Sequence, residues 1–131
     1  MKAKVGQRFK FEAAHFLKDY PGQCANIHGH SYKLEVVLEG EVNDKTGMLL
    51  DFSLFKEIIN DIILSYFDHR LVVEDKQDGY LDNEIISLGV PPTAENMAIF
   101  IREELETRLD TCLITIHTVR LWETEDCWAE V

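Results

Sequence analysis

The chain has 131 residues, 46% of them hydrophobic and 28% charged, a composition typical of a single soluble globular domain spanning residues 1–131. Thirteen basic and 24 acidic residues give a net charge of −11, which argues against general nucleic-acid binding because phosphate would be repelled. No apolar run approaches the roughly 20 residues of a membrane span, and the N-terminus resembles no signal peptide. Because three cysteines make no disulfide framework, we expect a cytoplasmic protein without a membrane partner.

Residues 2–16 and 28–42 alternate apolar and polar side chains, which predicts two strands. His28 and His30 share a face of the second strand, since alternate side chains of a strand point the same way. His15 continues the apolar face of the first strand, so a hairpin would bring it opposite this pair. Three neutral nitrogens with one open position are typical of a catalytic zinc ion, so this pattern predicts a zinc site.

Cys24 lies between the two strands, in a segment with a Pro-Gly turn signal, and is predicted to be presented on a loop. Two interpretations of this thiol stay open. It could close the zinc site as a fourth ligand, which would make the site structural. Alternatively it is a free thiol that a nearby imidazole activates for proton transfer.

The middle of the chain predicts two helices. The first follows an N-cap at Asp51 or Ser53, and the second begins after an N-cap at Thr93. Residues 74–90 are acidic and turn-rich, and are predicted to form a loop. The apolar positions of the helices recur at helical spacing, at Phe55, Ile58, Ile59, Ile62, Ile63, Tyr66 and Phe67, and at Met97, Ile101, Leu105 and Leu109.

The end of the chain predicts a second hairpin. The predicted order is therefore ββααββ, an α+β domain with an antiparallel four-stranded sheet and two helices on one face. The other face and the edges of this sheet stay uncovered, which favours a homo-oligomer.

Asp68 and His69 stand where the first helix is expected to end. There they either complement the helix terminus or act as a proton-transfer couple with Cys24. Glu123 continues an apolar strand face, where its carboxylate needs a partner, and Glu125 shares that face two residues later. The other cysteines, Cys112 and Cys127, are interpreted as packing residues.

Six short motifs occur in this order along nearly the whole chain: FEAAH, C-x-x-x-HGH, GMLLDF, FDH, PTAEN and WET. Jointly they resemble the 6-pyruvoyl-tetrahydropterin synthase family. The three residues between Cys24 and His28 are similar to the bacterial branch that forms 6-carboxy-5,6,7,8-tetrahydropterin for queuosine. The segment after His69 departs from the family pattern.

The resemblance implies roles for the matching residues. His15, His28 and His30 would hold Zn2+, Cys24 would be the catalytic base, and Asp68 with His69 would be its proton-relay partners. The pterin substrate would be bound by Glu123, with Thr93 near the ring. The family's tunnelling fold implies a homo-oligomer, trimer-based and hexameric, with active sites between subunits.

The implied reaction converts 7,8-dihydroneopterin triphosphate to 6-carboxy-5,6,7,8-tetrahydropterin, with release of acetaldehyde and triphosphate. Within the same fold, the alternatives are 6-pyruvoyl-tetrahydropterin formation and side-chain cleavage for folate synthesis. A structural zinc module closed by Cys24, without chemistry, is an alternative of another class. A thiol hydrolase using Cys24 and His69 would leave the three clustered histidines unexplained.

Overall fold

The computed structural model describes residues 1–77, 84–109 and 113–131. Six strands in these ranges form one sheet with the order β4-β3-β1-β2-β5-β6. The elements follow one another as β1 (Lys2–His15), η1 (Gln23–Ala25), β2 (His28–Glu41), α1 (Phe52–Ile59), η2 (Asn60–Leu64), α2 (Ser65–Phe67), β3 (Arg70–Val73), β4 (Ile85–Ser87), α3 (Ala94–Leu109), β5 (Ile114–Trp122) and β6 (Trp128–Glu130).

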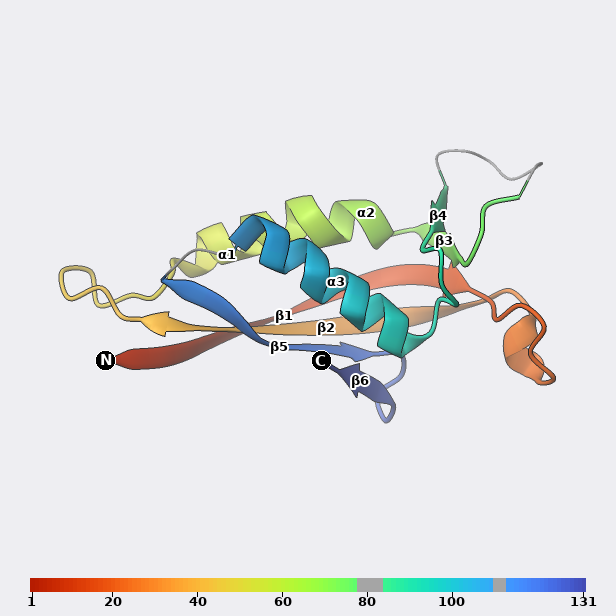
Figure 1. Cartoon of the computed structure of the whole chain (residues 1–131), viewed down its shortest axis with the longest axis horizontal. Helices are drawn as coiled ribbons and strands as arrows, with labels where there is room; N and C mark the ends of the chain where they lie inside the picture. The colour runs from red at the N-terminus through yellow and green to blue at the C-terminus, as the bar shows by residue number, and fades with distance from the viewer. Residues whose placement is uncertain (78–83, 110–112) are drawn as a thin grey trace.

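α1, η2, α2 and α3 pack on one side of the sheet, whereas η1 lies beyond the ends of β1 and β2 (Figure 1). The core lies between these two layers and is built from the inward side chains of β1, β2 and β5 and from the apolar faces of the helices. On the opposite side, β1 and β2 present most of their polar side chains. None of the described helices is long and apolar enough to cross a membrane.

The two long strands are confirmed as an antiparallel pair, with Lys2 opposite Glu41 and His15 opposite His28. Both predicted N-cap positions are also confirmed. The Asp51 carboxylate accepts a hydrogen bond from the Ser53 amide (2.7 Å), and the Thr93 hydroxyl accepts one from the Asn96 amide (3.2 Å).

The prediction of a four-stranded antiparallel sheet was wrong. The sheet has six strands and is mixed, because β3 pairs in parallel with both β1 and β4. The segment 74–90, predicted as a loop, contains β4, while its residues 78–83 lie outside the described ranges. β3 has four residues and β4 has three, so both are too short for an alternation of apolar and polar side chains to be recognised.

The first helical region changes its winding along its length. A five-residue π-helical stretch, η2, separates the α-helical segments α1 and α2. The fully buried side chains Phe55, Ile59, Ile63 and Phe67 follow one another at a spacing of four. In a regular α-helix, each such step advances about 40° beyond a full turn, so three steps would rotate the last side chain away from the core by ~120°. The wider π turn corrects this drift and keeps Phe67 inside.

Candidate metal centre

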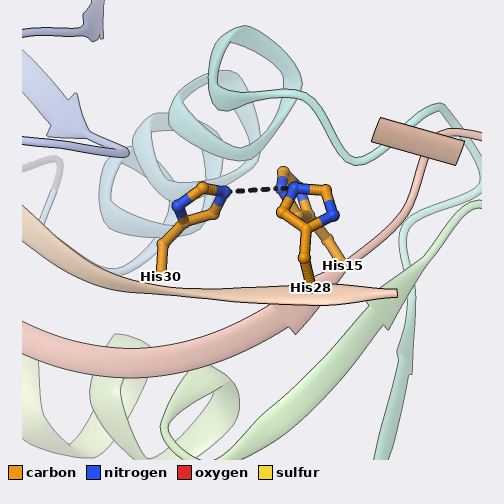
Figure 2. A group of neighbouring side chains, drawn as sticks. All are labelled: His15, His28 and His30. Carbon is orange, nitrogen blue, oxygen red and sulfur yellow. Dashed lines mark hydrogen bonds between the residues drawn. The ribbon is translucent and has the colours of Figure 1, made fainter. Parts of the chain in front are cut away.

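The pairing of β1 with β2 brings the three predicted ligands together. His15 stands directly opposite His28, and His30 lies opposite Ala13, two residues away along the same face. Figure 2 shows the three imidazole rings turned toward one another above the ends of the two strands. Because this face carries the core, His15 is only 3% exposed, while His28 and His30 are partly exposed.

The geometry of this cluster fits a small divalent cation. The Nε2 atom of His15 lies 3.0 Å from Nε2 of His28 and 3.1 Å from Nε2 of His30. One potential ligand atom from each residue lies within 4.8 Å of the others. A tetrahedral zinc ion with nitrogen ligands at roughly 2.0–2.1 Å would separate those nitrogens by about 3.3 Å. The three rings therefore stand close to the positions that zinc ligation requires.

Hydrogen bonds on the other ring nitrogens support the same conclusion. The Nδ1 atom of His15 donates to the Pro92 carbonyl (2.7 Å), and Nδ1 of His28 donates to the Asn26 carbonyl (2.7 Å). A neutral imidazole that donates from Nδ1 keeps its lone pair on Nε2. The lone pairs of His15 and His28 thus face a common point, and carbonyl partners of this kind orient metal-ligating histidines.

His30 is also held in the form that a metal ligand needs. Burial lowers its pKa, and the neighbouring His15 and His28 act in the same direction, whereas the nearby Glu123 carboxylate opposes them. The net effect favours the neutral imidazole, which has a free lone pair.

The carboxylate of Glu123, which directly follows β5, also lies beside the histidine cluster. Its Oε1 atom lies 3.3 Å from Nε2 of His15 and 3.7 Å from Nε2 of His30. A carboxylate facing nitrogen lone pairs is repelled unless a cation or a donor lies between them. Glu123 therefore adds to the negative potential at the cluster. Glu125 is exposed, in the turn between β5 and β6.

Cys24 and Thr93 line one cavity of about 300 Å³ together with His15, Glu123 and Cys127. The backbone amide of Leu17 donates to the Cys24 carbonyl (2.7 Å), which holds the loop against the end of β1. Both Cys24 and Cys127 are exposed free thiols. The interpretation of Cys127 as a packing residue was therefore wrong, and Cys112 lies outside the described residues.

His69 borders a different cavity from Cys24. This cavity, of about 690 Å³, is also lined by Glu12, His30, Ser31 and Arg70. The Glu12 amide donates to Oδ1 of Asp68 (2.9 Å), and the His69 amide donates to the Glu12 carbonyl (2.6 Å). Within one chain, the structure does not bring this pair into the Cys24 cavity.

Asp68 and His69 contact each other at the surface of the protein, with side chains that are 41% and 78% exposed. Nδ1 of His69 lies 3.0 Å from Oδ1 of Asp68. The hydrogen bond from the Glu12 amide, followed by the contacts with His69, lowers the pKa of Asp68 and so favours its carboxylate form. His69 adopts a φ of 60°, an uncommon conformation outside glycine that often marks functional positions.

Several contributors to the centre were not recognised in the sequence. The carbonyls of Asn26 and Pro92 are backbone groups, so no residue type indicates them. Tyr32 contacts His15 through its hydroxyl (3.3 Å). Its place two residues after His30, on the same strand face, is the signal that would have found it.

A family model described as 6-pyruvoyl tetrahydropterin synthase matches residues 4–131. The chain therefore belongs to the 6-pyruvoyl tetrahydropterin synthase family. It is 33% identical to the 6-carboxy-5,6,7,8-tetrahydropterin synthase of Rickettsia typhi, with 98% of this chain and 99% of the relative covered. It is 34% identical to the protein of that name from Haemophilus influenzae, with 97% and 96% covered.

Solved structures agree with the fold. The 6-pyruvoyl tetrahydropterin synthase of Caenorhabditis elegans matches with a TM-score of 0.80 and 26% identity, over 100% of this chain and 95% of that one. The corresponding structure from Plasmodium vivax matches with a TM-score of 0.83 over 100% and 97% of the two chains. At 18% identity, the second likeness concerns the fold alone.

We expect the protein to bind about one zinc ion per chain. Replacing His15, His28 or His30 by Ala should abolish this stoichiometric binding, because each replacement removes one of the three nitrogen ligands. Elemental analysis of the purified variants measures this. His117→Ala is the control, since His117 contacts Lys4 (2.9 Å), away from the cluster. Full zinc retention in all three cluster variants would contradict the assignment.

Proposed function

We propose that the protein is a zinc-dependent carbon–carbon lyase. It converts 7,8-dihydroneopterin triphosphate and water to 6-carboxy-5,6,7,8-tetrahydropterin, acetaldehyde and triphosphate, a step in queuosine and other 7-deazaguanine biosynthesis. The observation that carries the proposal is the convergence of three histidine nitrogens beside a cavity that also holds a thiol and a carboxylate. Full-length relatives named for this product support it. The activity is cytoplasmic in this proposal, because a reducing compartment keeps thiols such as Cys24 free.

The donor set favours zinc. Three neutral imidazoles and one open position are typical of catalytic zinc, whereas magnesium and calcium prefer oxygen ligands. When bound, zinc supplies Lewis-acid polarisation of a substrate oxygen, which makes the adjacent protons easier to remove.

Cys24 is the general base in this proposal. It is exposed on its loop and lines the cavity beside His15, so a substrate side chain placed there lies next to its sulfur. In its thiolate form, the Cys24 side chain can accept a proton from the substrate side chain and return it elsewhere on that side chain. Oxidation of the retained side-chain carbon balances reduction of the ring, so no redox cofactor is needed.

Glu123 binds the pterin in this proposal. Its two carboxylate oxygens suit the paired N–H donors of a pterin edge, as they suit a guanidinium. The side chain is 28% exposed and lines the cavity with Thr93, so it is accessible to a ligand. Thr93 lies near the ring at the beginning of α3.

We further propose that Asp68 and His69 act on the Cys24 of another subunit. Within one chain His69 borders a cavity that Cys24 does not line, so this proposal assigns the proton relay to the Cys24 of a second copy. β1 supports such an assembly, because β3 pairs only with its residues 13–15, and among the described residues no strand covers the rest of that edge. An edge of this length favours strand addition. The proposed assembly is a trimer-based hexamer of the tunnelling fold.

Formation of 6-pyruvoyl-tetrahydropterin is the second candidate. The name of the matching family model and the likeness to the Caenorhabditis elegans enzyme favour it. Both reactions eliminate triphosphate, and they differ in whether the two outer carbons of the side chain are released.

The products decide between these reactions. We expect the zinc-loaded protein to release acetaldehyde and triphosphate in equal amounts from 7,8-dihydroneopterin triphosphate, because the carboxy-forming reaction cleaves the side chain once per turnover. A coupled alcohol dehydrogenase assay and chromatography of the pterin measure this. Triphosphate without acetaldehyde would indicate the pyruvoyl reaction, and no turnover by a folded, metal-loaded oligomer would contradict both candidates.

Cys24→Ala is expected to keep its zinc and lose turnover by on the order of 100-fold or more, the usual scale for a positioned acid or base. Cys127→Ala is the matched control, because Cys127 lines the same cavity but has no assigned role. We expect it to retain turnover within a few-fold. Zinc loss in Cys24→Ala would instead indicate a closed structural site.

Mixed oligomers test whether the site is shared. Cys24→Ala and His69→Ala should each be inactive. When the two variants assemble together at random, about a quarter of the sites combine an intact Cys24 from one chain with an intact His69 from another, so up to about a quarter of wild-type activity should return. Cys24→Ala mixed with Glu123→Gln is the control, since both residues line one cavity of the same chain and no intact site can form. Equal recovery in both mixtures, or none in either, would contradict the shared site.

A further inference from the structure

Tyr32 lies directly beneath the histidine cluster, on the same face of β2. Its side chain is fully buried. The ring stacks on Phe11, with centroids 5.1 Å apart and planes at 11°. It also meets the rings of His15 and His30 edge-on, with centroid distances of 6.1 and 5.5 Å. One aromatic side chain therefore packs against two of the three proposed ligands.

The hydroxyl of Tyr32 reaches the inner nitrogen of His15. Its oxygen lies 3.3 Å from Nδ1 of His15, which also donates to the Pro92 carbonyl at 2.7 Å. Nε2 of the same ring faces the cluster. The orientation of His15 is thus defined by Pro92 and Tyr32 on one side and by the cluster on the other.

A hydroxyl at this position has a cost for folding. The hydroxyl is buried together with the rest of the side chain, so it has lost its contact with water. Among the described residues, His15 is the hydrogen-bond partner of this oxygen. Phenylalanine would fill the same space against Phe11 without burying a polar group. A core that needed only packing gains nothing from this hydroxyl.

We infer that Tyr32 is a positioning residue of the metal centre: its hydroxyl shares the Nδ1 proton of His15 with Pro92, and its ring fixes the planes of His15 and His30. This inference rests on the proposed metal site. Partners behind a ligating histidine commonly change metal affinity by about 10- to 100-fold. Loss of the hydroxyl leaves the Pro92 bond in place, so the expected loss lies toward the lower end of that range.

Zinc affinity of Tyr32→Phe, measured by competition with a chromophoric chelator, tests the inference. We expect about a 10-fold weaker affinity than in the wild type. Tyr66→Phe is the matched control, because Tyr66 stacks on Phe100 (5.3 Å) in the helical layer and should leave affinity unchanged. No zinc binding by the wild type would overturn the metal site and this inference together, whereas equal affinity of wild type and Tyr32→Phe would overturn this inference alone.

Two further measurements separate positioning from a structural role. Metal-free Tyr32→Phe should unfold at the same temperature as the wild type or higher, because a buried hydroxyl is removed. With both proteins saturated with cobalt, the visible ligand-field spectrum of the variant should shift, since the plane of His15 is less constrained. A destabilised metal-free variant with an unchanged cobalt spectrum would assign Tyr32 to packing and overturn the inference.

Discussion

The cross-strand pairing of His15 with His28 is the constraint on which the rest of the centre depends. The connection between the two strands runs from residue 16 to 27, too long to fix the pairing by tight-turn geometry. The register follows instead from two 14-residue strands that pair along their whole length. A slip of one residue would move His28 and His30 to the other face of the sheet, together with the apolar residues that follow them. The packing of the core and the convergence of the three imidazoles therefore both require the same pairing register of β1 and β2.

Much of this arrangement could be predicted from the sequence, because long strands and amphipathic helices leave a periodic pattern. The shared face of the three histidines, the N-caps at Asp51 and Thr93, and the final hairpin all follow from local patterns. β3 and β4 could not be predicted, since they are short and are formed by parallel pairing with distant residues. The separation of His69 from Cys24 depends on how those strands pair, and no local pattern records it.

β1 also divides the chemistry of the molecule between its two faces. His15 points to the helical layer and the metal centre, while the adjacent even-numbered residues point to the other face. Glu12 belongs to that second set, and its backbone fixes both Asp68 and His69 through hydrogen bonds. The strand thus holds two sets of ionisable groups that cannot meet through it. The proposed shared site would bring them together through a second copy of the chain.

The π-helical turn bears on how relatives of this chain should be aligned. A π turn holds one residue more than the α turn that it replaces, so a relative with a regular helix would reach the position equivalent to Asp68 one residue earlier. An alignment that places the resulting gap in the following loop would shift Phe67 and its neighbours out of register with their structural equivalents. A gap placed within Asn60–Leu64 would preserve the equivalence of the buried side chains on both sides. In an alignment to this helix, the position of a gap therefore decides which buried side chains are treated as equivalent.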